Sequence, residues 1–369
     1  MFRKTAQPAK PTPASDGASV TETAPCQKSV RLRVPREEIA PVRSAVLAEF
    51  QRQAALPGFR KGKAPAEVVE RQYAQDIQTE TLHRVTKQAF ERVAADHGLK
   101  PVGPFEVSQA DFSETEGLTL EATVEVEPAF ALGAYQGIAL TREPLAVAPQ
   151  ELEQALASLR ESMAQLVPAK EEGETKERQL PPVDDELAKD LGFETLEKLK
   201  AHVAAKVLEQ KRTAQARALE AALCDALLAR HAFEVPPRLV IRQTEQLTRD
   251  FKTRLLLSGI SEEQAAQETE QFTRELRTSA ERHVKLAFIL DRIASQESVQ
   301  VTQDELVKRL WQLSQRWKKD PVEVRKLFDA QGLWPSVVSS IRQEKTIAFL
   351  LSAAHIDDSK PEDQADKTA

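Results

Sequence analysis

The sequence predicts an α+β domain at the N-terminal end, followed by a mostly α-helical C-terminal domain. Near the N-terminus, segments that alternate polar and apolar residues flank segments with helical periodicity. From about residue 184 to residue 356, apolar residues recur every three or four positions almost throughout. Aromatic residues make up only 5% of the chain and glycines number only 12, which argues against an all-β sandwich or barrel.

The length of 369 residues exceeds that of one ordinary domain, so we expect two or more domains. The N-terminal segment is rich in Pro, Ala, Thr and Ser and has no apolar stretch typical of an export signal. No apolar run approaches the length needed to span a bilayer, so no membrane partner is expected. The predicted organisation is a disordered tail over 1–26, a domain over 27–127, an extended linker with one helix over 128–183, a helical domain over 184–356 and a disordered tail over 357–369.

The α+β domain is predicted element by element. Residues 29–34 alternate as in a half-buried strand. Pro35 and the acids Glu37 and Glu38 then favour a helix start, since proline suits the first turn and acids complement the helix dipole. A second helix is predicted from Pro65 towards Gly98, followed by short strands around 105–107 and 118–126.

The linker is predicted to be extended, with a strand-like piece at 138–140 and a helix from Pro149 through Met163. Residues 167–177 are charged and polar, and they are too few to form a core.

The helical domain carries two predicted capping boxes, Ser261 to Gln264 and Thr302 to Glu305. An apolar stripe is expected in the core, as such stripes usually are, and consists of Phe272, Leu276, Ala280, Val284 and Phe288. The three tryptophans, Trp311, Trp317 and Trp334, are predicted to pack locally.

One segment between the two predicted N-terminal helices combines unusual residues. In Leu56 to Pro65, two glycines and two prolines enclose a phenylalanine and three cations, which predicts a tight exposed loop. Phe59 beside Arg60, Lys61 and Lys63 leaves an aromatic ring in water unless a partner covers it. An ordinary helix connector is the alternative interpretation. A phosphate-binding loop is excluded, since the glycine spacing is short and no hydroxyl residue follows Lys63.

Charge is distributed unevenly along the chain. The formal net charge is −6, which argues against a general nucleic-acid binder. From Lys28 to Tyr73, however, ten Lys and Arg residues stand against five acids, so this segment carries +5 and the remainder −11. A basic region on an acidic protein suits docking to one polyanionic assembly.

No catalytic, metal or cofactor site is predicted. The six histidines lack metal-binding spacing, and no nucleophile or dinucleotide motif is present. The two cysteines, Cys26 and Cys224, lie far apart in a chain with no export signal, so we expect two free thiols in a reducing compartment, the cytoplasm.

The loop and its flanking elements resemble the ribosome-docking loop of the trigger factor family of bacterial nascent-chain chaperones. The resemblance extends along most of the chain. It implies a docking domain followed by an elongated helical chaperone domain with arm-like extensions. Carried over residue by residue, the docking positions are Gly58, Phe59, Arg60, Lys61, Gly62, Lys63 and Pro65.

The resemblance implies an ATP-independent chaperone that binds the large ribosomal subunit beside the exit tunnel, through protein and rRNA, and shields apolar segments of nascent or unfolded polypeptides. In this family a prolyl isomerase domain of the FK506-binding type follows the helix of the linker. Here only residues 167–177 lie before the segment at which the chain returns, so we expect no isomerase activity. Whether the free protein forms a homodimer is left open. A scaffold that binds folded proteins without holding unfolded ones is the alternative function.

Overall fold

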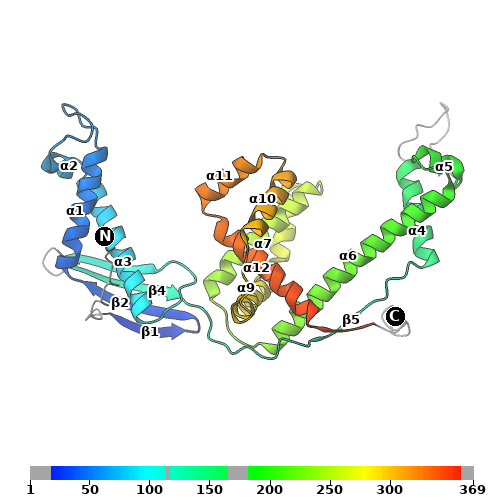
Figure 1. Ribbon diagram of the computed structural model, residues 1–369. Helices are drawn as coiled ribbons and strands as arrows, with labels where there is room; N and C mark the ends of the chain where they lie inside the picture. The colour runs from blue at the N-terminus through cyan, green and yellow to red at the C-terminus, as the bar shows by residue number, and fades with distance from the viewer. Residues whose placement is uncertain (1–17, 114–116, 165–181, 359–369) are drawn as a thin grey trace, which may run out of the picture. The chain divides into compact units, whose positions relative to one another are not determined.

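The computed structural model describes residues 18–113, 117–164 and 182–358 (Figure 1). They belong to two compact units, each formed by two stretches of the chain. One unit takes its residues from 1–131 and 232–288, and the other from 132–231 and 289–369. In the described ranges, no helix is both long and apolar enough to cross a membrane.

The N-terminal part of the first unit is built on a four-stranded antiparallel sheet with the order β1-β2-β4-β3. The strands are β1 (Ser19–Ala24), β2 (Gln27–Val34), β3 (Glu106–Ser113) and β4 (Gly117–Glu125). The central pair β2 and β4 runs in register from Gln27 opposite Glu125 to Val34 opposite Leu118. The alternation of residues in these two segments therefore predicts both strands correctly, and the strand predicted around 105–107 is confirmed but is longer.

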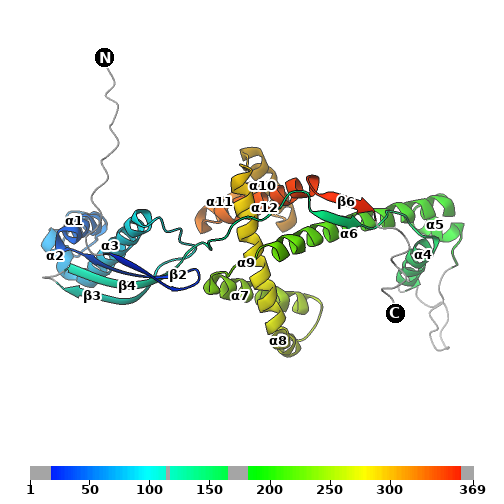
Figure 2. The same cartoon turned by 90° about the horizontal axis from the view of Figure 1, so that it is seen from below.

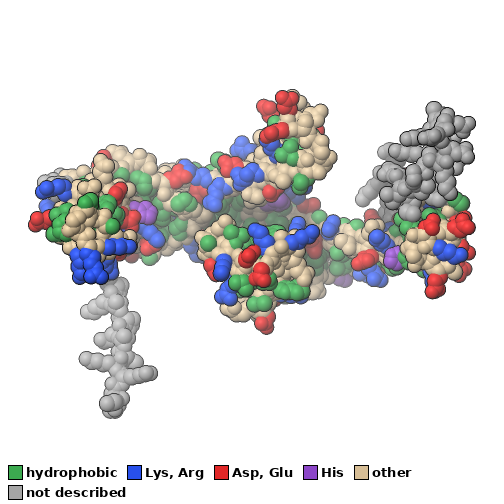
Figure 3. Space-filling view, turned by 90° about the horizontal axis from the view of Figure 1, so that it is seen from above, with side chains coloured by type: hydrophobic (Ala, Val, Ile, Leu, Met, Phe, Trp, Pro, Cys, Tyr) green, Lys and Arg blue, Asp and Glu red, His purple; other side chains and the backbone are tan. Residues whose placement is uncertain are grey.

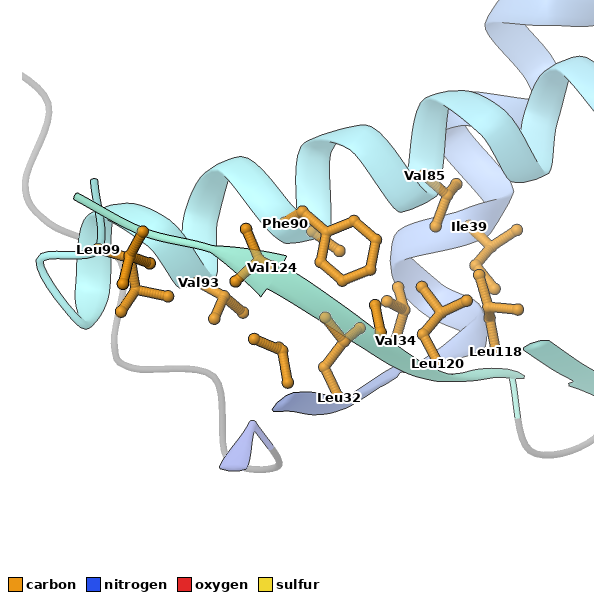
Figure 4. Close-up of a cluster of buried hydrophobic side chains, with 14 residues drawn as sticks. Leu32, Val34, Ile39, Val85, Phe90, Val93, Leu99, Leu118, Leu120 and Val124 are labelled. Atoms are coloured by element: carbon orange, nitrogen blue, oxygen red, sulfur yellow. The ribbon is translucent and has the colours of Figure 1, made fainter. Parts of the chain in front are cut away.

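Three helices accompany the sheet, α1 (Arg36–Gln53), α2 (Ala66–Gln72) and α3 (Ala74–Asp96). Figure 4 shows side chains of α1 and α3 directed at those of β2 and β4, which form one apolar core. Phe90 of α3 lies at its centre and stacks on Phe105 with ring centroids 4.2 Å apart. The period-2 strands and the helical stripes thus meet in a single layer of buried side chains.

Strand β1 corrects the prediction of a disordered tail over 1–26. Val20 pairs with Val30 of β2 and packs against the apolar core, so the strand adds buried apolar surface to the sheet edge. Cys26, with a φ of 60°, supports the turn that joins β1 to β2. The remainder of that predicted tail, residues 1–17, lies outside the described residues.

The prediction of one helix from Pro65 to Gly98 is also wrong, because the backbone breaks at Tyr73. Tyr73 has a φ of −115° and a ψ of 27°, which separates α2 from α3. Its ring lies against Phe50 of α1, with centroids 5.9 Å apart. The break lets Val69 of α2 pack under the loop while α3 follows the sheet.

The second unit begins with the linker, which contains β5 (Ala139–Arg142) and α4 (Pro149–Ala164). It continues with α5 (Asp185–Asp190) and α6 (Leu196–Arg230). Leu156 of α4, Ala188 of α5 and Leu199 of α6 form a small buried core. Residues 167–177, for which a polar connection is predicted, lie outside the described residues.

The rest of the helical region contains α7 (Pro237–Leu257), α8 (Glu262–Gln271), α9 (Thr273–Gln296), α10 (Gln303–Trp317), α11 (Pro321–Gln331) and α12 (Trp334–Ser352). Thr302 and Glu305 form the predicted reciprocal capping box. Ser261 caps α8 through the amide of Gln264. Ala280 and Val284 are buried as predicted, but Phe272 is exposed, because it occupies the junction between α8 and α9.

The last described element, β6 (His355–Asp358), corrects two predictions, a helical domain ending at 356 and a disordered tail from 357. Figure 2 shows β6, in red, beside β5, and the two strands pair in parallel from Ala139 opposite His355 to Arg142 opposite Asp358. The pairing joins segments more than 200 residues apart in sequence. Local sequence patterns carry no signal for such a partner.

Candidate functional site

The loop that joins α1 to α2 is closed by its own backbone hydrogen bonds. The amide of Gly62 donates to the carbonyl of Ala54 at 3.1 Å, which brings the two ends of the loop together. Within it, the amide of Phe59 donates to Leu56 at 3.1 Å and the amide of Lys63 donates to Arg60 at 2.9 Å. The loop therefore consists of two tight turns in succession.

Both glycines of the loop adopt backbone angles that favour glycine. Gly58 has a φ of 84° and Gly62 a φ of 77°, both in the left-handed region. A Cβ atom on Gly62 would also lie 2.9 Å from the carbonyl oxygen of Arg52, whereas one on Gly58 would meet nothing within 4 Å. Both the backbone angle at position 62 and the lack of room for a Cβ atom therefore require glycine there.

The base of the loop is anchored by a small apolar cluster of its own. Ala54, Ala64 and Val69 are buried there, and Leu56 and Tyr73 pack against them. The side-chain amide of Gln51 donates to the carbonyl of Ala64 at 2.8 Å. The ends of the loop are thus held on α1 and α2, while its tip extends from them.

An ion-pair network stiffens the helices beneath the loop. The guanidinium of Arg84 on α3 bridges Glu49 on α1 and Glu80 on α3, at 2.7 Å and 2.6 Å. The hydrogen bond from Arg84 lowers the pKa of Glu49. Arg43 of α1 pairs in the same way with Glu70 of α2 at 2.8 Å.

The tip of the loop presents unpaired charge and an uncovered ring. The side chains of Arg60, Lys61 and Lys63 are exposed and make no ion pair with any described residue. Phe59 is 42% exposed among them. Pro65 is exposed at the N-cap of α2.

All seven predicted docking residues therefore belong to one compact loop. The ring and the three cations lie on it without partners from the described part of the chain. Such an arrangement can bind a partner that has an apolar pocket beside anionic groups, which can be phosphates or carboxylates.

The helical region exposes apolar side chains that periodicity alone could not locate. The exposed large hydrophobic residues on its helices and their junctions are Ile241, Leu256, Leu257, Phe272, Val307, Trp311, Trp317 and Val322. Figure 3 shows hydrophobic side chains at the surface beside Lys and Arg side chains. Exposed apolar groups on helices provide contacts for unfolded chains.

The tryptophans divide into two classes. Trp317 and Trp334 pack edge-on against Phe328, with centroids 6.0 Å and 5.5 Å away, and the indole of Trp334 donates to Asp329. These two follow the prediction of local packing. Trp311 does not, because it is 57% exposed on the outer side of α10.

The linker is held against the other segments of the second unit by hydrogen bonds. The amide of Gly133 donates to Nε2 of His231 at 2.9 Å, and the Tyr135 hydroxyl donates to Glu297 at 2.7 Å. Beyond β5, Lys211 of α6 pairs with Glu151 at 2.7 Å. The linker therefore gains hydrogen bonds from α6, from the end of α9 and from β6.

Among the described residues, no three His, Cys, Asp or Glu side chains are grouped so as to hold a metal ion. Neither Cys26 nor Cys224 is in a disulfide bond in the part of the chain that the structure describes. The Cys26 thiol donates to the carbonyl of Glu234 at 3.3 Å, and burial followed by nearby carboxylates raises its pKa. A raised pKa keeps this thiol protonated and unreactive.

Two family models match the chain. One, described as bacterial trigger factor protein, matches residues 18–159, and one for the C-terminus of the same protein matches residues 195–352. The trigger factor of Anaeromyxobacter sp. (strain Fw109-5) is 25% identical over 423 residues, covering 91% of this chain and 98% of that protein. The trigger factor of Carboxydothermus hydrogenoformans is 26% identical over 410 residues, covering 88% and 96% respectively.

Two solved structures are also similar. A structure concerned with promiscuous substrate recognition by the trigger factor chaperone is 19% identical, covers 90% of this chain and 99% of its own, and has a TM-score of 0.44. A structure of trigger factor domains from Thermotoga maritima is 23% identical, covers 37% of this chain and 83% of its own, and has a TM-score of 0.29.

Proposed function

This chain belongs to the trigger factor family, and on that premise we propose that the loop between α1 and α2 is the part of it that docks on the ribosome. Ribosome docking and the shielding of nascent chains are the family's function, so the protein is a ribosome-associated chaperone. What the family does not settle is which residues of this chain make the contact.

The observation that carries the proposal is the exposed Phe59 among three cations that have no partner in the described chain. Elsewhere in the same domain, some cations are paired with carboxylates, as Arg43 and Arg84 are, and others are exposed without an ion pair, as Arg36 and Lys87 are. Leaving three cations unpaired on one anchored loop suits a partner with phosphate groups, and an exposed ring suits an apolar pocket beside them. We propose that the partner is the large subunit near the exit tunnel, through both rRNA and protein.

The direct test is co-sedimentation with ribosomes of the triple variant Phe59→Ala/Arg60→Ala/Lys61→Ala. These side chains are exposed and belong to neither apolar cluster of the domain, so the fold should survive their removal. We expect binding to fall by at least about 100-fold, since a buried aromatic anchor and two charged contacts together contribute roughly 3 kcal/mol or more.

The matched control is Phe112→Ala/Arg36→Ala/Lys87→Ala, which removes the same residue types from the same domain. Phe112 is 42% exposed, as is Phe59, and Arg36 and Lys87 are likewise exposed and make no ion pair with described residues. The control should bind as the native protein does. Equal loss in both triple variants would mean that general charge, rather than this loop, holds the ribosome.

We propose that client shielding needs no nucleotide. Docking keeps the helical region near the emerging chain, so weak apolar contacts act at high effective concentration. Each buried client side chain contributes about 1.5 to 3 kcal/mol before entropy costs, so several together hold a chain and still release it. The exposed residues on α7, α10 and α11 are the proposed contacts.

We propose further that the chain lacks prolyl isomerase activity. The alignments with relatives extend over 423 and 410 positions, more than the 369 residues of this chain, so those relatives contain a segment with no counterpart here. The two family-model matches leave only residues 160–194 between them.

We place the protein in the cytoplasm, where the ribosomes are. Any homodimer formed off the ribosome would be detected by sedimentation equilibrium.

A further inference from the structure

The helical hairpin formed by α10 and α11 exposes more apolar surface than its own packing requires. Val307 and Trp311 lie one turn apart on α10, and their side chains are 62% and 57% exposed. Trp317 at the end of α10 and Val322 at the start of α11 are exposed as well. We call these four residues the hairpin patch.

The hairpin patch lies on two helices whose ends are capped. Thr302 and Glu305 cap the start of α10, and Lys318 ends it in the left-handed conformation with a φ of 52°. Asp320 caps the start of α11 through the amide of Val322 at 2.7 Å. Phe328 is buried between the rings of Trp317 and Trp334. The exposure is therefore built into the folded hairpin and does not come from a frayed end.

The hairpin carries more cations than carboxylates: over residues 303–331, seven Lys and Arg residues stand against five Asp and Glu residues, a net charge of +2. Its cations, apart from Arg309, are exposed and make no ion pair or side-chain hydrogen bond with any described residue: Lys308, Arg316, Lys318, Lys319, Arg325 and Lys326. Arg309 pairs with Glu344 of α12.

The carboxylates of the hairpin are largely engaged elsewhere. Glu305 is held by Lys345 and by the amide of Thr302, which lower its pKa. The Asp320 carboxylate accepts a hydrogen bond from the amide of Val322 as the cap of α11, and the Asp329 carboxylate accepts one from the indole of Trp334. Only Asp304 and Glu323 have no described partner. Asp320 and Asp329 keep their charge, because their partners are neutral N–H groups, so the surplus of positive charge beside the apolar side chains is the +2 of the whole hairpin.

We propose that the hairpin patch selects unfolded polypeptide segments in which Asp and Glu alternate with apolar residues. This inference rests on the proposed chaperone function and names the clients that this part of the helical region prefers. The apolar side chains supply the affinity, because they lose water on binding. The unpaired cations supply the selection, since charge complementarity contributes more to specificity than to affinity.

Charge complementarity is the reason for proposing an acidic and apolar segment as the bound polypeptide. A segment rich in Lys and Arg would meet repulsion from the surrounding cations, and a purely apolar one would leave them without partners. An acidic and apolar segment satisfies both kinds of side chain. Because the contacts are at the surface, the selection should weaken as salt is added.

The experiment uses two labelled unfolded peptides with the same apolar residues, one flanked by Glu and the other by Lys. The native protein should bind the Glu-flanked peptide roughly tenfold more tightly, since several exposed ion pairs together contribute that much. Lys308→Glu/Arg325→Glu/Lys326→Glu should reverse the preference. Trp311→Phe should reduce the change in tryptophan emission that the peptide causes, with Trp317 of the patch giving the remainder, which places the peptide at the patch.

The control, Lys200→Glu/Lys206→Glu/Arg217→Glu on α6, makes the same change in net charge at exposed residues where no large hydrophobic side chain is exposed. It should keep the native preference. Reversal in the control, equal binding of both peptides, or tighter patch-dependent binding of single-stranded RNA would each overturn the proposal.

An aggregation assay with a neutral apolar client distinguishes failure of the proposed charge selection from failure of the chaperone function itself. If suppression of its aggregation in a light-scattering assay persists in every variant while the peptide preference is absent, the charge selection fails and the chaperone function stands. If no variant, nor the native protein, suppresses aggregation, the chaperone function itself fails.

Discussion

At the scale of single residues, the loop between α1 and α2, the proposed docking loop, contains some residues that shape it and others that we propose contact the ribosome. Gly62 shapes the loop, because both its φ and the nearby carbonyl of Arg52 exclude a side chain. Phe59 and its neighbouring cations contribute nothing to the packed cluster at the base. Glycines and prolines around an aromatic ring and three cations are visible in the sequence, which is why an exposed loop could be predicted here. The seven docking positions follow from the family resemblance and stay a prediction.

Gly62→Ala tests the shaping role. A left-handed backbone on a residue with a side chain costs about 1 to 2 kcal/mol, and the contact with Arg52 adds to that. The amide of residue 62 should then exchange with solvent at least about tenfold faster in native-state hydrogen exchange. Gly58→Ala, with open space around its Cβ, should show the smaller effect, and equal effects would show that the space near Arg52 does not matter.

At the scale of elements, the prediction succeeded where local periodicity decides the structure and failed where tertiary contacts decide it. Strands β2 and β4 follow from alternation, and helix α1 follows from the proline and the acids at its start. Strand β6 depends on a partner far along the chain, and its residues His355 to Asp358 show no apolar alternation of their own. Strand β1 was missed because its polar outer residues resemble those of a tail.

The pairing of β6 with β5 should depend on pH. Arg142 donates to Asp358 at 2.5 Å, and this hydrogen bond lowers the pKa of Asp358 below its ordinary value of 3.8. A lowered pKa in the fold means that the contribution is present above that ordinary value and is lost as the pH falls through the folded-state pKa. The amide of His355, which donates to Ile138 at 2.9 Å, reports on the pairing.

Asp358→Asn should remove that dependence. At pH 7 the variant's His355 amide should exchange about threefold faster than in the native protein, as expected for an exposed pair. As the pH falls through the folded-state pKa of Asp358, the protection of the two proteins should converge. Protection that responds to pH equally in both would show that Arg142 and Asp358 do not couple.

At the scale of the whole molecule, the chain divides its charge and its apolar exposure between different regions. The segment from Lys28 to Tyr73, around the proposed docking loop, carries +5 while the remainder carries −11, so a polyanion should be attracted mainly to that segment. Which apolar helix faces are exposed could not be predicted, because a stripe at helical spacing looks the same whether another helix covers it or not. Val307 and Trp311 illustrate this, since they share α10 with the half-buried Leu306 and Leu310.

The missing segment leads to a prediction for the whole chain. Refolding of a client whose slow phase is limited by proline isomerisation should proceed at the uncatalysed rate, tens to hundreds of seconds at 25 °C, with the native protein present. A relative that contains the additional segment serves as the positive control. Acceleration by this chain would show that the activity resides in residues it retains.

The central claim is that the tip of the loop contacts the ribosome, and photo-cross-linking tests it most directly. A photoreactive phenylalanine analogue is placed at position 59 in one variant and at the equally exposed position 112 in another, and each is illuminated with translating ribosomes. We predict cross-links from position 59 to components of the large subunit at the exit tunnel, and none above background from position 112. Cross-links of equal yield from both positions, or none from position 59 while the protein still sediments with ribosomes, would contradict the claim.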